Sequence, residues 1–133
     1  MKDIIEKIKT AICDLEKTNG NILVFALFLR EGLFDKWDII VAASWLDSKK
    51  MDDYKIISSE IQKVLNDSEF LQFSRIVILD QDDPVVSFLQ NLKTIKNGSY
   101  QEFSGEVLSN QFGFTIKRAY LLRSQKIDKT SSN

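Results

Sequence analysis

Histidine is absent from the 133-residue chain, and cysteine and proline occur once each, as Cys13 and Pro84. Without histidine the chain cannot form a Ser-His-Asp or Cys-His catalytic pair, a histidine general base or the usual histidine-containing zinc site. A single cysteine cannot form a disulfide within the chain, which argues against a secreted disulfide scaffold. Any catalysis would depend on carboxylates, lysine, tyrosine, serine or the one thiol.

Long apolar segments are missing as well. The longest apolar run, Ile22 to Leu29, is far shorter than the ~20 residues that a membrane-spanning helix needs. The first residues are charged and amphipathic, with no apolar signal core and no small-residue cleavage site. We therefore expect a soluble, cytoplasmic protein that does not associate with membranes.

Phosphate-binding motifs are also lacking. Gly98, Gly105 and Gly113 are too widely spaced for a dinucleotide cradle or a P-loop. The segment Gly32-Leu33-Phe34 lacks the Gly-Ser helix start of a nucleotidyltransferase. The sequence therefore implies no cofactor and excludes a polymerase-like transferase.

Charge gives no general attraction for nucleic acid, because the net charge is −1. Basic residues are nevertheless concentrated near the carboxyl terminus, where Asp128 is the one acidic residue among them. They are Lys117, Arg118, Arg123, Lys126 and Lys129. Blocks this short are typical of a solvated strand and a basic tail, so a nucleic-acid partner is not expected.

The composition is that of one ordinary globular domain, with 44% hydrophobic and 28% charged residues. Apolar residues at helical spacing predict a helix over residues 3–18, which Asn19-Gly20 ends. Residues 22–29 and 37–46 are predicted strands joined by a short connection, which favours an antiparallel pair. A helix from Asp47 or Ser48 to about residue 66 follows, with a further turn after it.

The second half begins with a predicted strand over residues 75–79. Asp83-Pro84 then predicts the cap and first position of a helix that ends at Asn97-Gly98. Residues 100–108 and 114–122 are predicted as the last two strands, joined as a hairpin through Asn110 and Gly113.

These elements predict a single-domain α+β fold in the order α-β-β-α-β-α-β-β. The expected sheet has five strands, is mostly antiparallel and carries its helices mainly on one face. The domain is expected to span residues 1–126, and the polar residues 127–133 to form a disordered carboxyl-terminal tail.

The second predicted strand is the least ordinary element. Asp38 is unusual in an apolar strand, and the favoured interpretation is an ion pair with Lys36, Arg30 or Arg75, a general acid or base being the alternative. Large and small side chains share one face of this strand: Trp37, Val41, Ala43 and Trp45. This face is either core or, together with Asp38, the wall of an apolar ligand pocket.

An acidic group follows the third predicted strand. Asp80, Asp82 and Asp83 could hold Mg²⁺ or Ca²⁺ through carboxylate oxygens, or they could only cap a helix and form a turn. The spacing matches no calcium-binding loop, so no metal site is assigned and both alternatives stay open.

Aromatic and basic residues gather around the predicted hairpin tip. Phe112, Phe114, Lys117 and Arg118 could stack on single-stranded nucleic acid or contact a protein partner. A protein partner is the favoured interpretation of this group.

Two segments carry a resemblance. KWDIIVAASWLD at residues 36–47 and RIVILD at residues 75–80 resemble a pattern in small uncharacterised bacterial proteins, some of them labelled ligand-binding proteins or antitoxins. The element order is similar to that of sensory domains of the GAF and PAS type. The resemblance attaches no activity to the chain and implies only that a ligand-binding or antitoxin role should be tested.

Three functional hypotheses follow. The leading one is a non-catalytic binding module that acts through a protein partner, such as the antitoxin of a bacterial toxin–antitoxin pair. The second is a small-ligand sensor with its pocket at the face that Trp37 and Trp45 share. The third is an enzyme that pairs Asp38 with Asp80 or Asp82 in a cleft. An exposed sheet edge would also make a homodimer unsurprising.

Overall fold

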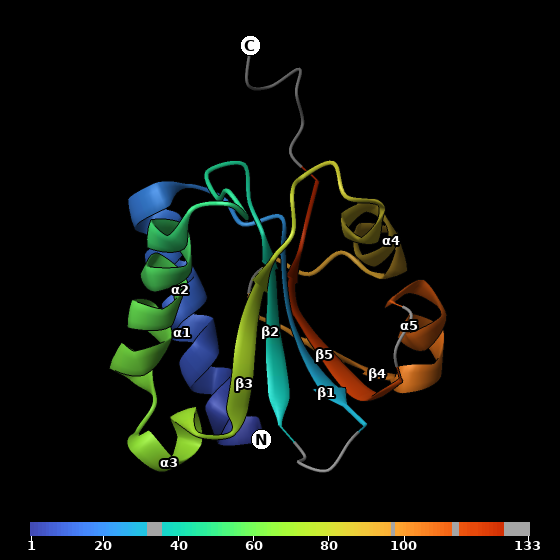
Figure 1. Cartoon of the computed structure of the whole chain (residues 1–133), viewed down its shortest axis with the longest axis horizontal. Helices are drawn as coiled ribbons and strands as arrows, with labels where there is room; N and C mark the ends of the chain where they lie inside the picture. Colours follow the sequence, from blue (N-terminus) through green and yellow to red (C-terminus); the bar gives the residue numbers. More distant parts are fainter. Residues whose placement is uncertain (32–35, 97, 113–114, 127–133) are drawn as a thin grey trace.

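A five-stranded sheet with helices on both faces forms the protein (Figure 1). The computed structural model describes residues 1–31, 36–96, 98–112 and 115–126. The strands are β1 (Val24–Arg30), β2 (Trp37–Ala42), β3 (Phe73–Ile78), β4 (Gln101–Ser104) and β5 (Ile116–Ser124). Their order across the sheet is β3-β2-β1-β5-β4. The sheet is antiparallel except for β2 and β3, which run parallel, so the predicted α+β class with a mostly antiparallel sheet is confirmed.

The first face is covered by α1 (Lys2–Asn19), α2 (Met51–Val64) and the short α3 (Asp67–Phe70). The apolar stripe of α1 packs against this face, while Cys13 is exposed on the opposite side of the helix. The core of this layer includes Ile8 and Ile12 from α1 with Phe25 and Leu27 from the sheet.

The second face is covered by α4 (Pro84–Leu92) and α5 (Gly105–Phe112). Val86 and Leu89 of α4 and Leu108 of α5 pack there with Phe28 of β1. Although the longer helices lie on the first face, as expected, the second face is covered too. The reason is that β1 and β2 are apolar on both sides, so each face needs its own layer of helices.

The predicted hairpin over residues 100–122 is right in its antiparallel pairing, because β4 pairs with β5, and wrong in its tight turn. Its first strand ends at Ser104, and residues 105–112 form α5 instead of a strand and a tight turn. Gly105 makes this turn possible, because a Cβ there would lie 1.3 Å from the carbonyl oxygen of Ile116. The Ser109 hydroxyl donates to the Gly105 carbonyl and accepts from the Ile116 amide, which ties α5 to β5.

The second strand also ends earlier than predicted, at Ala42 instead of Leu46. A turn follows, in which the Leu46 amide donates to the Ala43 carbonyl. The next helix consequently starts at Met51, after Lys50, and not at Asp47 or Ser48. Asp47 does cap a backbone group, but it is the amide of Lys49 within the connecting loop.

Candidate functional site

A pocket of about 440 Å³ lies at the carboxyl ends of β2 and β3. After β2 the chain passes to α2 on the first face, whereas after β3 it passes to α4 on the second face (Figure 1). Adjacent parallel strands whose connections leave to opposite faces create a crevice, and open α/β sheets commonly bind their ligands there. The topology therefore marks this pocket as a candidate site.

Both connecting loops line this carboxyl-end pocket. The lining residues are Ala43, Ser44, Leu46, Asp47, Lys49, Asp80, Gln81 and Asp82. The Ser48 hydroxyl donates to Asp80 Oδ1 over 3.0 Å and joins the two loops. A second hollow of about 570 Å³ shares Ser44, Gln81 and Asp82 with the pocket and extends toward α4. Carboxylates, amides and hydroxyls together suit a small polar ligand.

Two of the three aspartates that follow β3 have structural partners. Asp83 is the N-cap of α4, where its Oδ1 accepts from the Val85 amide over 2.9 Å, so the predicted cap is confirmed. Asp80 is engaged by Ser48, and Asp82 lines the pocket. Within the described residues no group of three or more acidic, cysteine or histidine side chains could hold a metal ion. Capping and turn formation therefore account for Asp80 and Asp83.

A third hollow, which is apolar and has a volume of about 390 Å³, lies between α2 and β3. Met51, Tyr54, Lys55 and Ser58 line it from one side of α2, and Ile76 lines it from β3. Met51 is 69% exposed, so its apolar side chain is accessible at the start of α2. We call this hollow the α2/β3 groove. Tyr54 is fixed there because its hydroxyl donates to the Ser48 carbonyl over 2.9 Å.

Asp38 is fully buried and ion-paired, as the favoured interpretation of the sequence predicted. Its Oδ2 lies 2.6 Å from Arg30 Nε and 3.3 Å from Arg75 Nε. Asp38 is in register with Arg75, five residues before Asp80, so the two carboxylates are separated by roughly 16 Å along the strand. The enzyme hypothesis needed Asp38 beside Asp80 or Asp82, and the structure does not bring them together.

The tryptophan face of the sheet packs under helices α1 and α2. Trp37, Val41 and Ala43 are buried there within one apolar cluster. Trp45 lies beyond the end of β2, packs against the same cluster and donates its indole N–H to the carbonyls of Gly20 and Asn21. Of the predicted ligand-binding residues, only Ala43 also lines the carboxyl-end pocket.

The predicted partner-binding residues do not gather at a hairpin tip, because α5 stands in its place. Phe112 ends α5, and Phe114 lies outside the described residues. Lys117 and Arg118 are exposed on β5. Arg118 donates to Glu102 of β4 over 2.7 Å, and this contact raises the pKa of its guanidinium. It also donates to the Tyr120 hydroxyl.

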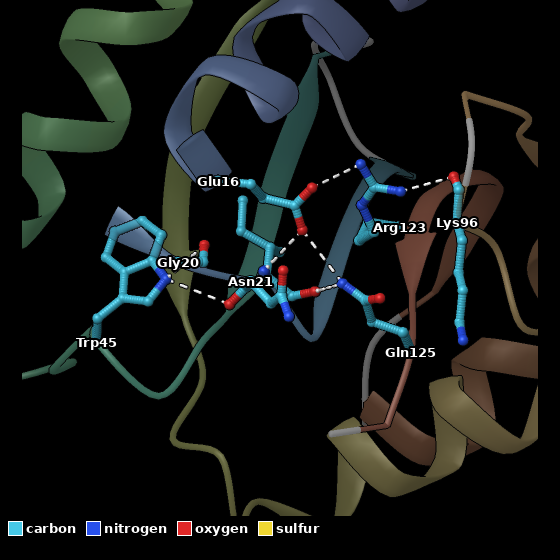
Figure 2. A network of polar contacts seen from close by, with 8 residues as sticks. Glu16, Gly20, Asn21, Trp45, Lys96, Arg123 and Gln125 are labelled. Carbon is cyan, nitrogen blue, oxygen red and sulfur yellow. Dashed lines mark hydrogen bonds and ion pairs between the residues drawn. The ribbon is translucent and has the colours of Figure 1, made fainter. Parts of the chain in front are cut away.

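A largely buried polar network near the carboxyl end of β5 was not predicted, in which the Arg123 side chain is 9% exposed and that of Glu16 16%. Figure 2 shows Glu16 of α1 between Arg123, 2.7 Å away, and Gln125. The second Glu16 oxygen also accepts from the Ile22 amide, and Arg123 donates to the Lys96 carbonyl over 2.6 Å. Arg123 directly follows the predicted strand at residues 114–122, where the charge pattern is typical of a solvated strand and a basic tail, so the sequence gives no signal for this pair.

No family model, curated protein or solved structure matches this chain. Among the helices of its described part, none combines the length and apolar character needed to cross a membrane. The geometry of the pocket and the groove therefore carries the functional argument.

Proposed function

We propose that the protein is a non-catalytic binding module that acts through a protein partner, which it contacts along the α2/β3 groove. The observation that carries this proposal is an apolar groove beside a strand at the edge of the sheet. Exposed apolar surface next to an edge strand is typical of protein–protein contact sites. The antitoxin of a toxin–antitoxin pair is one role that such a module performs.

Co-expression with the product of the neighbouring gene, followed by co-purification, tests this proposal. Met51→Asp places a charge in the groove and should abolish the complex, because burying an unpaired carboxylate is costly. Leu71→Asp is the matched control, since Leu71 is 65% exposed and does not line the groove. Absence of a complex, or equal loss in both variants, would refute the proposal. For the antitoxin role, the chain must also relieve the toxicity of its partner.

A second candidate function is the binding of a small polar ligand in the carboxyl-end pocket. The position of this pocket between loops that leave to opposite faces of the sheet favours it. This site replaces the sensor pocket expected at the Trp37 face, which α1 and α2 cover. A thermal-shift screen of polar metabolites should identify a compound that stabilises the wild type. The same compound should have no effect on Ser44→Phe, in which the new ring fills the pocket.

A further inference from the structure

We infer that the partner adds a β-strand along β3, and that this strand carries acidic side chains beside the apolar ones that enter the groove. This inference rests on the proposed binding function and specifies the chemistry of the partner. The partner is thus an acidic, strand-forming protein segment.

The backbone of β3 supplies the first part of the argument. β3 ends the strand order, and its ladder partner is β2, on one side of it. Because alternate residues of a strand direct their N–H and C=O groups to opposite sides, about half of these groups in β3 face away from β2. The amide of Leu79 donates toward β2, to Val41. By alternation the backbone groups of Ile76 and Ile78 point outward, where an added strand would bind them.

The α2/β3 groove supplies the apolar part of the contact. Residues 51, 54, 55 and 58 follow helical spacing, so they form one stripe of α2 parallel to the strand edge. An added strand would direct every second side chain toward this stripe, at intervals of about 6.6 Å. Met51 is a suitable contact for such side chains, because its flexible thioether adapts to different shapes.

Charge determines which segment fits. Lys55 is the charged residue among those that line the groove. Arg75 lies on the opposite face of β3 from Ile76, and its side chain is 49% exposed although it contacts Asp38. An added strand therefore meets a base on each face of the sheet, and acidic side chains complement both.

A second copy of the chain fits this edge less well. Antiparallel pairing of two β3 strands would bring the Arg75 side chains of both copies close together, and the Lys55 side chains would add to the same charge. Like charges across a strand pair are destabilising. The occupant is accordingly a different chain, and self-association becomes an outcome that the experiment can reveal.

Fluorescence anisotropy with three labelled nine-residue peptides tests the inference. In the first peptide two valines alternate with two glutamates, so that each face of the added strand carries both residue types. In the second lysine replaces glutamate, and the third is the first with central amides N-methylated. The first should bind, and its affinity should fall as salt rises from about 50 to about 500 mM. The lysine and N-methylated peptides should bind at least about tenfold more weakly, because they lack the charge or the strand donors.

Charge reversal provides the decisive variants. Lys55→Glu should weaken the glutamate peptide by about fivefold or more and strengthen the lysine peptide. Lys63→Glu is the control, because this exposed lysine of α2 lies off the groove. Hydrogen exchange of the Ile76 and Ile78 amides should slow when the peptide is bound.

Three results would overturn the inference: no binding of the glutamate peptide, equal binding of all three peptides, or dimers of the chain that Lys55→Glu strengthens. If the co-expressed partner still binds and Met51→Asp still releases it, the proposed function stands and the acidic-strand inference fails. If neither the glutamate peptide nor the co-expressed partner binds the wild-type protein, both proposals fail.

Discussion

Replacement of Glu16 by glutamine should remove a charge from the polar network of Figure 2 without changing its shape. The carboxylate accepts from Arg123 through one oxygen and from Ile22 and Gln125 through the other. An amide offers one acceptor and one donor group, so one of these two sets of donors must face an N–H group. The substitution therefore leaves a donor unpaired whichever way the amide turns.

The size of this effect follows from the burial of Arg123, which is 8% exposed. Removing one partner of a fully buried ion pair costs about 3–5 kcal/mol, and a lost charge-assisted hydrogen bond about 1.5–3 kcal/mol. Arg123 keeps its bond to the Lys96 carbonyl, so we expect a loss of about 3 kcal/mol. For a chain of this length, that loss lowers the melting temperature by about 12 °C.

Urea denaturation and thermal unfolding of Glu16→Gln and the wild type measure the loss. Glu6→Gln is the matched control on the same helix, because its exposed ion pair with Lys9 is worth about 0.5 kcal/mol or less. A double-mutant cycle with Arg123→Met should give a coupling energy of about 2 kcal/mol. A loss below about 1 kcal/mol for Glu16→Gln would refute the reasoning, because the network would then be screened like a surface pair.

Three further predictions follow from single contacts. Asp38→Asn should lower the free energy of unfolding by about 2–4 kcal/mol, since it leaves Arg30 and Arg75 without their buried countercharge. A decrease of less than about 1 kcal/mol, measured by urea denaturation, would contradict this. Gly105→Ala should cost about 3 kcal/mol or more, because its Cβ would collide with the Ile116 carbonyl. A melting temperature equal to that of the wild type would contradict this close contact. Hydrogen bonds from the Lys7 ammonium and, to a smaller extent, the Asn66 amide lower the pKa of Glu69 from its ordinary 4.5. The stabilisation that the ionised Glu69 gives the fold is therefore present above pH 4.5 and is lost as pH falls through the lowered pKa. A carboxyl NMR titration should show this pKa rising in Lys7→Met, and an unchanged value would exclude the contact.

Local patterns in the sequence were sufficient to predict those helices and strands whose pattern is typical of only one kind of secondary structure. The stripe of α1, the apolar run of β1 and the Asp83-Pro84 start of α4 all appear in the structure near their predicted positions. The burial and ion pairing of Asp38 could also be predicted, because an isolated charge inside an apolar strand needs an opposite charge.

Features that depend on contacts distant in sequence could not be predicted in this way. The predicted strand ran to residue 108, whereas α5 begins at Gly105, whose backbone packs on the Ile116 carbonyl, a contact from a segment distant in sequence. The Glu16–Arg123 pair joins residues 107 positions apart, so no local pattern reveals it. The carboxyl-end pocket needs the strand order and the direction of both loops, which the sequence does not state.

Both candidate surfaces arise from the way β3 joins the sheet. The helix α2 carries the chain back across the first face, so β3 runs parallel to β2 and lies at the edge. Parallel direction brings the carboxyl ends of β2 and β3 together and forms the pocket. Among the residues that the structure describes, the edge position leaves one side of β3 open along α2. Ser48 connects the two, because its hydroxyl donates to Asp80 and its carbonyl accepts from Tyr54 of the groove. A ligand that displaces Ser48 from Asp80 would therefore also act on the surface where we expect the partner to bind.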